Sequence, residues 1–384
     1  MNFPGTIKSK RQQKGTTIFS VMSALANETN AINLSQGFPD FSISSRLIEL
    51  VHKHMKAGHN QYAPMPGIPS LRVAIAEKIY ATYSKEIDFQ SEITITAGAT
   101  QAIYTAITAT INEGDEVILF DPAYDCYVPA IELNNGIAVQ IPLSGPDFRI
   151  NWEDVKKRVN QKTRMIIINT PHNPTGAILT AGDMLKLEKI VQGTDIIILS
   201  DEVYEHVIFD NYEHQSVLRF PRLAERSFVV FSFGKTFHAT GWKVGYCIAP
   251  NQLMNLFRQV HQFLIFSVNT PMQFALAEFL ADDKNYNGIE HMYEKKRDLF
   301  RSLLSTSRLK LLPCLGTYFQ TVDYSAISEA KDTDYAIQLT KDEGVASIPI
   351  SVFYNNPPEC RYLRFCFAKE DSTLEKAAEI LVNL

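Results

Sequence analysis

The chain has 384 residues with 45% hydrophobic and 11% aromatic residues, enough to build a large core over more than one domain. Its 37 basic and 42 acidic residues give a net charge of −5 without any block of like charge, which argues against a nucleic-acid-binding or membrane-surface protein. We therefore expect small-molecule partners, no nucleic acid and no membrane.

From about residue 93 the sequence alternates between short apolar runs and amphipathic stretches. The apolar runs are rich in Val and Ile, as is typical of strands covered on both faces. They span residues 93–98, 116–122, 138–143, 164–171, 195–202, 228–233 and 244–250. Between several of them, as at 100–111 and 181–193, apolar residues recur at helical spacing. This alternation predicts an α/β domain with a mostly parallel, seven-stranded sheet between helices.

After residue 250 the pattern changes to that of a smaller α+β domain. Helix-like and strand-like stretches occur at 251–262, 272–283, 286–306, 317–324, 332–343 and 362–367. Residues 1–45 hold few strand signals, and we expect them to cross back to this second domain. The predicted division is a large domain of residues 46–270 and a small domain of residues 1–45 and 271–384.

The cysteines and the N-terminal segment indicate a reducing compartment. The five cysteines are odd in number and never spaced C-x-x-C, as is typical of reduced core thiols. The first fifteen residues are polar and basic without the apolar stretch of a secretory signal, and no apolar run has membrane-spanning length. We expect a cytoplasmic protein. The nine histidines lack metal-binding spacing, so we expect no metal site.

Polar residues follow the strand-like runs, and in an open α/β sheet ligands bind beyond the carboxyl ends of the strands. In chain order these residues are Ala99, Thr100, Gln101, Tyr124, Asn173, Asp201, Tyr204, Ser232 and Lys235. The first three open a helix whose free amides could hold a phosphate. A phosphate cradle, a flat ring, an amide, an acid and a lysine together suit pyridoxal phosphate.

Two other motifs that include Lys235 are excluded by the surrounding sequence. The triplet Gly-Lys-Thr would end a nucleotide-binding P-loop only if a glycine stood at position 229, which is Val229. Ser232 and Lys235 have the S-x-x-K spacing of serine β-lactamases, but the S-D-N and K-T-G triplets of that chemistry are missing.

Several segments resemble one family in order and at coherent spacing. "NTPHNPTG", "LSDEVYEHVIF", "SFGKTFHATGWKVGY" and "LRFCFA" are similar to the signature segments of the class I aminotransferases, pyridoxal-phosphate enzymes of fold type I. "LSQGFPDF", "HNQYAP" and "DPAYDCY" resemble the branch of kynurenine, glutamine and methionine aminotransferases. The resemblance runs from about residue 16 to the C-terminus.

The resemblance implies roles for the residues around the cofactor ring. Lys235 matches the lysine that binds the cofactor aldehyde, and its amine can also shuttle the substrate's α-proton. Asp201 matches the acid facing the pyridine nitrogen, which it keeps protonated. Asn173 and Tyr204 match the donors to the ring's phenolate oxygen. Tyr124 matches the aromatic ring that stacks on the cofactor.

The phosphate group, by the same resemblance, lies at a helix start beside one cation, Lys243. The implied ligands are the amides of Ala99 and Thr100 with Gln101 beside them, the Ser232 hydroxyl and Lys243. Many relatives have Arg at the last position, where Lys supplies a charge without a bidentate fork. Tyr62 resembles the tyrosine that reaches the phosphate of a neighbouring subunit, which implies a homodimer with shared active sites.

The resemblance implies contacts to the substrate carboxylate, and nearby aromatic residues are candidates for its side-chain pocket. Arg364 matches the arginine that grips the α-carboxylate with two parallel hydrogen bonds, and Asn173 lies beside the same site. Gly37 matches a backbone contact to that carboxylate, and Phe19, with Phe38 and Tyr62, is a candidate to line an apolar pocket. No second arginine is placed for a dicarboxylate, so we expect donors with large, weakly polar side chains: methionine first, then aromatic residues, glutamine and kynurenine.

The expected function is therefore a ping-pong transaminase that moves the amino group of an amino acid to a 2-oxo acid. Two alternatives stay open from the sequence. One is a carbon–sulfur β-lyase acting on cysteine conjugates, which uses the same cofactor chemistry. The other is a non-catalytic binding module of the same fold, although the presence of both Lys235 and Asp201 favours chemistry.

Overall fold

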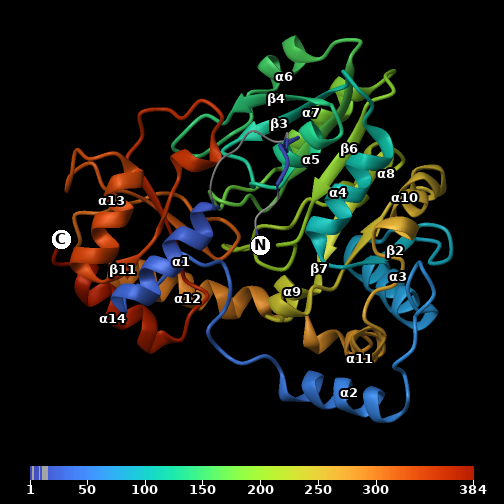
Figure 1. The fold of residues 1–384 in the computed structure, drawn as a ribbon, viewed down its shortest axis with the longest axis horizontal. Helices are drawn as coiled ribbons and strands as arrows, with labels where there is room; N and C mark the ends of the chain where they lie inside the picture. The colour runs from blue at the N-terminus through green and yellow to red at the C-terminus, as the bar shows by residue number, and fades with distance from the viewer. Residues whose placement is uncertain (2–3, 8, 11–15) are drawn as a thin grey trace.

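The computed structural model describes residues 1, 4–7, 9–10 and 16–384. Its largest sheet has seven strands in the order β2-β8-β7-β6-β5-β3-β4, and several of them are labelled in Figure 1. The strands are β2 (Ile93–Thr96), β3 (Glu116–Asp121), β4 (Ile137–Pro142), β5 (Thr163–Asn169), β6 (Ile197–Asp201), β7 (Ser227–Ser232) and β8 (Gly245–Ile248). The predicted α/β class with a mostly parallel sheet of seven strands is confirmed.

One strand departs from the parallel pattern. β8 is antiparallel to both of its neighbours, β2 and β7. Its connection from β7 holds only the short helix α9 (Phe233–Thr236) and one 3₁₀ turn (Thr240–Trp242). Neither forms the long crossover helix that would return the chain to the other end of the sheet, so the chain doubles back.

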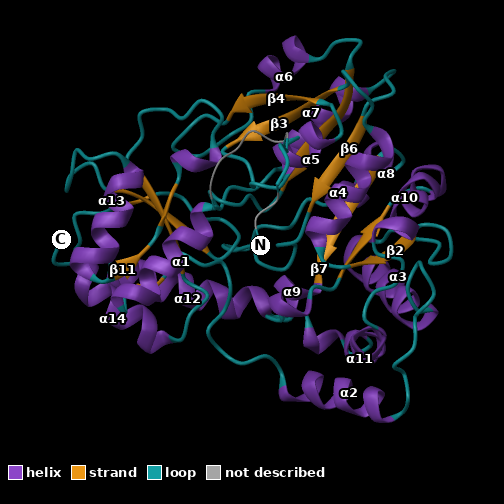
Figure 2. Ribbon diagram, in the orientation of Figure 1, coloured by secondary structure: helices purple, strands orange, loops and turns teal. Residues whose placement is uncertain are grey.

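Helices cover both faces of this sheet (Figure 2), because alternate strand residues point to opposite sides. In β7, Phe228 and Val230 belong to one apolar core, while Val229 and Phe231 belong to the other. The first core is closed by α4 (Ala99–Thr110), α5 (Tyr127–Leu133) and α10 (Asn251–Leu264). The second is closed by α3 (Pro69–Tyr83), α6 (Trp152–Arg158), α7 (Ala181–Val191), α8 (Pro221–Ala224) and α11 (Thr270–Leu280).

A smaller antiparallel sheet stands beside the large one, in the order β12-β13-β10-β9. Its strands are β9 (Lys310–Leu311), β10 (Phe319–Asp323), β12 (Ile348–Pro349) and β13 (Tyr362–Cys366). Its helices are α12 (Ile289–Leu303), α13 (Asp332–Gln338) and α14 (Asp371–Leu381). The mixed helix and strand content matches the predicted α+β part.

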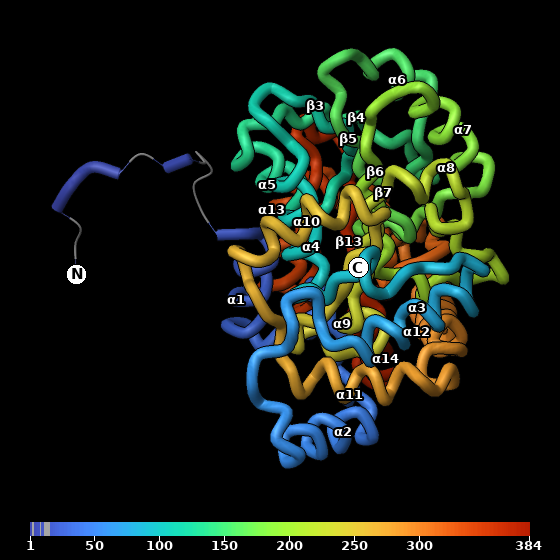
Figure 3. Tube along the Cα trace, turned by 90° about the vertical axis from the view of Figure 1, so that its right-hand side faces the viewer, coloured from blue at the N-terminus to red at the C-terminus, as the bar shows by residue number. Residues whose placement is uncertain are grey.

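The N-terminal segment joins this smaller part (Figure 1). Helix α1 (Ile18–Thr29) leads into β1 (Ile32–Asn33), which pairs in parallel with β11 (Val345–Ala346). Helix α2 (Ser45–Lys56) then packs against α11, below the large sheet in Figure 3. The domain division at residues 45 and 270 stays a prediction. Within the described residues no helix combines the length and apolarity needed to cross a bilayer.

Candidate active site

A cavity of about 140 Å³ lies beyond the carboxyl ends of β5, β6 and β7. Strand ends, helix starts and loops from five segments of the chain converge on it. It is lined by Ala99, Thr100, Ile103, Tyr124, Asn169, Asn173, Asp201, Val203, Tyr204, Ser232, Gly234, Lys235, Thr240 and Lys243. This is the position at which open α/β sheets bind ligands.

One end of the cavity has the charge and shape of an anion site. Helix α4 starts after Gly98, which adopts φ +77° and gives the helix no side-chain cap, so its first amides are free. Lys243 lies over this end: a Cβ at position 98 would sit 3.3 Å from its Nζ. Among the described residues no carboxylate pairs with Lys243. A cation above a helix N-terminus is repelled unless an anion lies between them, which fits a phosphate.

Gly245 allows β8, β7 and the start of α4 to pack closely. A Cβ at this position would lie 2.6 Å from the Phe231 carbonyl oxygen and 3.2 Å from the Ala99 nitrogen. Both contacts are with backbone that cannot move aside. A side chain here would therefore push the start of α4 away from β7 and β8.

The other end of the cavity holds a buried acid. The Asp201 carboxylate accepts a hydrogen bond of 2.6 Å from the Tyr127 hydroxyl and one of 3.4 Å from the Val203 amide. Burial raises the pKa of Asp201 to about 6 despite these bonds and the nearby charge of Lys235. A charged partner at this end would favour the ionised acid, and the protonated nitrogen of a pyridine ring is such a partner.

Lys235 lies between the two ends, on the short helix α9. Its Nζ donates to the Tyr318 hydroxyl at 2.7 Å and to the Gly37 carbonyl at 3.3 Å, and it lies 5.4 Å from the centre of the Tyr204 ring. Burial lowers the pKa of this amine to about 8. The neutral form, which an amine needs in order to act as a nucleophile or base, is therefore far more populated near neutral pH than in an exposed lysine.

Arg364 supplies a cation on the side facing the N-terminal loop. The side chain is almost completely buried and donates to Asn173 Oδ1 at 2.8 Å and to the Ser35 carbonyl at 3.2 Å. Its buried Nε has no partner among the described residues, and none of their carboxylates pairs with it. The guanidinium lies 3.9 Å from the centre of the Phe319 ring. An unneutralised buried guanidinium fits the binding of a carboxylate ligand.

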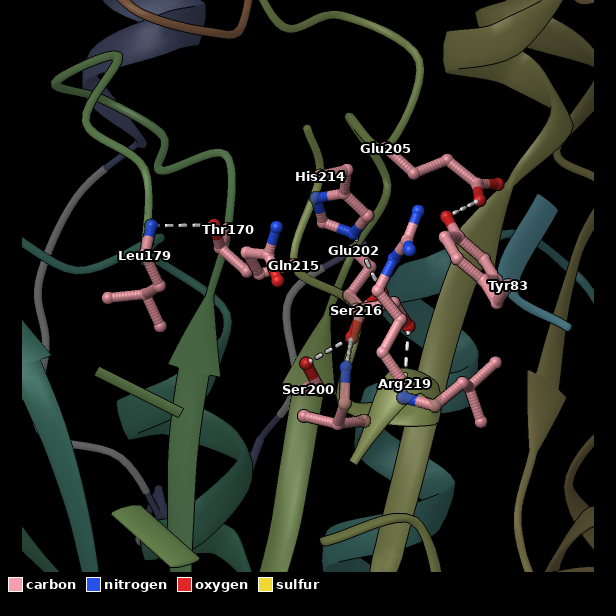
Figure 4. Close-up of polar contacts among 12 residues, drawn as sticks. Tyr83, Thr170, Leu179, Ser200, Glu202, Glu205, His214, Gln215, Ser216 and Arg219 are labelled. Atoms are coloured by element: carbon pink, nitrogen blue, oxygen red, sulfur yellow. Dashed lines mark hydrogen bonds and ion pairs between the residues drawn. The ribbon is translucent and has the colours of Figure 1, made fainter. Parts of the chain in front are cut away.

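A second polar network is built around Glu202 and Glu205, which follow Asp201 in the chain (Figure 4). Glu202 is fully buried and accepts from the Ser200 hydroxyl at 2.7 Å and the Val217 amide at 3.1 Å, with His214 Nε2 at 2.8 Å. Glu205 accepts from Lys78 and, at 2.5 Å, from the Tyr83 hydroxyl. Because these carboxylates bond to α3 and to the loop after β6, they fix the strand end that carries Asp201.

Most of the residues expected at the site meet in the cavity. Those that line it are Ala99, Thr100, Tyr124, Asn173, Asp201, Tyr204, Ser232, Lys235 and Lys243. Gly37, Phe19 and Arg364 adjoin it. Gly37 bonds to Lys235, and a Cβ there would meet Phe319 at 2.7 Å. The Phe19 ring lies 5.4 Å from the Arg364 guanidinium.

Three expected residues lie elsewhere. The Gln101 amide points along α4, donating to Thr105 Oγ1 at 2.6 Å and facing His261 Nδ1 at 3.1 Å. Helical spacing turns it away from its neighbours Ala99 and Thr100. Tyr62 is 83% exposed and packs edge-on against Phe266, outside the cavity of its own chain. Phe38 lies outward, over the Lys369 amine.

Three residues at or beside the site were not expected from the sequence. Asn169, the last residue of β5, donates to the Asp201 carbonyl and accepts from the Asn173 amide, each at 2.9 Å. Tyr127 bonds Asp201 from three residues after Tyr124, at the first residue of α5. Tyr318 bonds Lys235 from the smaller part of the chain, and nothing in its local sequence signals this. Among the described residues no cluster of His, Cys, Asp and Glu could hold a metal ion.

Comparisons with known proteins identify relatives of this chain. Residues 29–381 match the model of the family "Aminotransferase class I and II". The chain is 50% identical, over the full length of both chains, to methionine aminotransferase of Escherichia coli (strain K12). It is 34% identical to human kynurenine–oxoglutarate transaminase 3, over 95% of this chain and 87% of that protein.

Solved structures agree in the fold. The crystal structure of YbdL from Escherichia coli, identified as a methionine aminotransferase, superposes with a TM-score of 0.97 at 49% identity, covering 99% of this chain and all of the other. A Thermus thermophilus aspartate aminotransferase mutant superposes with a TM-score of 0.90 at 26% identity, covering 99% of both chains. The chain therefore belongs to the aminotransferase class I and II family and is an enzyme that transfers amino groups.

Proposed function

We propose that this enzyme binds pyridoxal 5′-phosphate at Lys235 and transfers amino groups between 2-oxo acids and amino acids with large, weakly polar side chains, methionine first among them. The observation that carries the proposal is the pairing of Lys235, whose pKa burial lowers to about 8, with Asp201, whose pKa burial raises to about 6, in one cavity. Oppositely perturbed groups in a cleft are typical of catalytic pairs.

The residues of the cavity suit the parts of this cofactor. The free amides at the start of α4, the Ser232 hydroxyl and Lys243 would hold the phosphate. Asp201 would hold the ring nitrogen, and Tyr124 would cover a ring face. Asn173 and Tyr204 would donate to the ring hydroxyl. Pyridoxal phosphate, when bound, supplies a protonated ring that accepts the electron pair left after the substrate's α-proton departs.

Lys235 would move the proton. With a pKa of about 8, its free amine can take the proton from the substrate Cα and return one in the reverse half-reaction. Arg364 would orient the substrate by gripping the α-carboxylate, and its bond to Asn173 Oδ1 fixes the plane of the guanidinium.

The preference for methionine and aromatic donors rests on the wall around Arg364. Phe19, Phe319 and Phe353 all place their rings within 5.5 Å of the guanidinium carbon. Apolar walls favour large apolar side chains and leave a second carboxylate unpaired. The 50% identity with the E. coli protein named methionine aminotransferase supports methionine as a donor.

A test follows the absorbance of the bound cofactor while single amino acids are added without any 2-oxo acid. We expect methionine and phenylalanine to change the spectrum at least about ten times faster than aspartate, because the rings around Arg364 form an apolar wall with no second arginine among the described residues there. Lys235→Ala is the matched control and should bind the cofactor without turnover. A faster change with aspartate contradicts the pocket assignment. Pyruvate and ammonia released from a cysteine conjugate without an acceptor, faster than methionine reacts, would favour a β-lyase.

We also propose that two chains share their active sites. Tyr62 and Phe263 are 83% and 90% exposed, and Leu264, Ile265 and Phe266 lie exposed beside them. Neighbouring exposed aromatic and aliphatic side chains of this kind often mark an interface with another chain. Tyr62 would reach from this patch into the neighbouring chain's phosphate site. The five free thiols support a cytoplasmic location, which fractionation of the producing cells would check.

A further inference from the structure

The hydroxyl of Tyr318 joins two parts of the site that come from distant segments. It donates to the Gly37 carbonyl at 2.6 Å and accepts from Lys235 Nζ at 2.7 Å. The Lys235 amine also reaches the same carbonyl, at 3.3 Å. These three contacts form a closed triangle between the N-terminal loop, the smaller part of the chain and the catalytic lysine.

The backbone before Tyr318 is held in a rare conformation. Thr317 has φ +65°, although its β-branched side chain makes this region costly. The Thr317 amide donates to the Val207 carbonyl at 2.9 Å, and its hydroxyl accepts from the Phe319 amide at 3.3 Å. Such strain is retained where the surrounding structure fixes it, and it is concentrated at functional sites. Here it precedes the residue that bonds the lysine.

Packing leaves the Tyr318 ring little freedom. The residue is fully buried, and its ring lies 4.9 Å from Phe319, 5.1 Å from Tyr204 and 5.6 Å from Tyr293, measured between ring centres. Burial raises the pKa of the phenol well above its usual value, so it stays neutral. A neutral phenol that donates its one proton to Gly37 can only accept from Lys235.

We propose that Tyr318 is a positioning residue that holds the free amine of Lys235 in place and links it to the Gly37 loop. This rests on the proposed function, in which the amine is free while the substrate occupies the cofactor. A lysine side chain has four rotatable bonds, and a free amine without a fixed acceptor would be spread over several positions. Fixing it beside the reacting carbon makes proton transfer more frequent.

The contact also bears on the acidity of Lys235. The ionisable groups near this amine include the Tyr318 and Tyr204 phenols, Cys366 and Asp201, which favour its charged form, and Arg364 and Lys243, which oppose it. Removing the Tyr318 phenol oxygen takes one hydrogen-bond acceptor from the ammonium form. The pKa of Lys235 should therefore fall further.

The experiment compares wild type with Tyr318→Phe, which keeps the ring and its packing. Tyr293→Phe is the matched control, because it removes a buried phenol that bonds His238 instead of Lys235. In the cofactor-free protein, the pKa of Lys235 is measured by acylation at a series of pH values with mass spectrometry. We expect Tyr318→Phe to lower it by about one unit, a tenfold change in proton affinity, and the control to leave it unchanged.

In the cofactor-loaded enzyme we expect Tyr318→Phe to lower kcat about tenfold while the donor KM changes less than about twofold. Equal kcat and equal Lys235 pKa in wild type and variant would overturn the proposal, as would a raised KM with unchanged kcat. Cofactor binding by the wild type is checked separately. If the wild type does not bind the cofactor but Tyr318→Phe still lowers the pKa of Lys235, the proposed function is wrong. The contact between Tyr318 and Lys235 is then still supported.

Discussion

Burial acts on Asp201 and Lys235 in opposite senses, because it penalises the charged form of each. It raises the pKa of the acid to about 6 and lowers that of the amine to about 8. In the cofactor-free protein the ionised acid therefore lowers the free energy of unfolding at neutral pH. The folded-state pKa of Asp201 exceeds its unfolded value of 3.8, so its stabilising contribution is complete below pH 3.8 and is lost as the pH rises through about 6.

Asp201→Asn should separate stability from activity. Without cofactor at pH 7, the variant should be more stable than wild type by about 1–3 kcal/mol, because an amide can stay hydrogen-bonded to Tyr127 without a buried charge. At pH 3.5 the difference should vanish. With cofactor, kcat should fall on the order of 100-fold, because the ring nitrogen loses its counter-charge. Urea unfolding at both pH values and steady-state kinetics measure this, and an unchanged stability at pH 7 contradicts it.

At the scale of the elements, helix α3 is tied to the loop after β6 by the buried pair Lys78 and Glu205. Burial alone would raise the pKa of Glu205, but Lys78, His206 and the Tyr83 hydroxyl outweigh it and hold that pKa below its usual range. The pair's contribution is therefore present above pH 4.5, the unfolded value, and is lost as the pH falls toward about 2.

Lys78→Met should destabilise the protein by about 3–5 kcal/mol at pH 7, because it leaves Glu205 charged and unpaired in the core. Adding Glu205→Gln should restore part of this loss and remove the fall in stability between pH 4.5 and 2. Lys53→Met is the control: its bond to Glu278 is exposed and should matter by less than about 1 kcal/mol. Equal losses for Lys78→Met and Lys53→Met in denaturant unfolding would refute the account.

The sequence predicted those elements that have a local signal. All seven strands of the large sheet follow from their apolar runs, because each strand is covered on both faces. The direction of β8 does not follow, since it depends on the connection from β7. Gln101 was expected at the site because it follows Ala99 and Thr100, but helical geometry turns it toward α10.

At the scale of the whole molecule, contacts between distant segments limited the prediction. The resemblance to the family identified Lys235, Asp201 and Arg364, whereas the contact of Tyr318 with Lys235 joins residues 83 positions apart and has no local pattern. The neighbourhood of Arg364, Ser35 and Asn173 likewise depends on the packing of the smaller part against the large sheet. Such contacts follow from the three-dimensional arrangement alone.

The exposed apolar patch at the end of α10 predicts a dimer. Sedimentation should give twice the 43.3 kDa of the chain. Phe263→Asp should shift the population to monomer and lower activity at least about tenfold, because each site would lose the neighbour's Tyr62. Leu185→Asp, at an exposed apolar position on α7, should change neither. A wild-type chain that sediments as a monomer with full activity would disprove the shared site.

The covalent attachment of the cofactor at Lys235 is tested most directly by borohydride reduction of the protein incubated with pyridoxal phosphate, followed by peptide mass mapping. We expect the peptide that contains Lys235 to gain the mass of one reduced cofactor. In the Lys243→Ala variant, whose phosphate site is weakened, we expect no such gain at Lys235 when the cofactor is dilute. A wild-type chain whose Lys235 peptide stays unmodified, or is labelled no more than exposed lysines such as Lys53, would contradict the account.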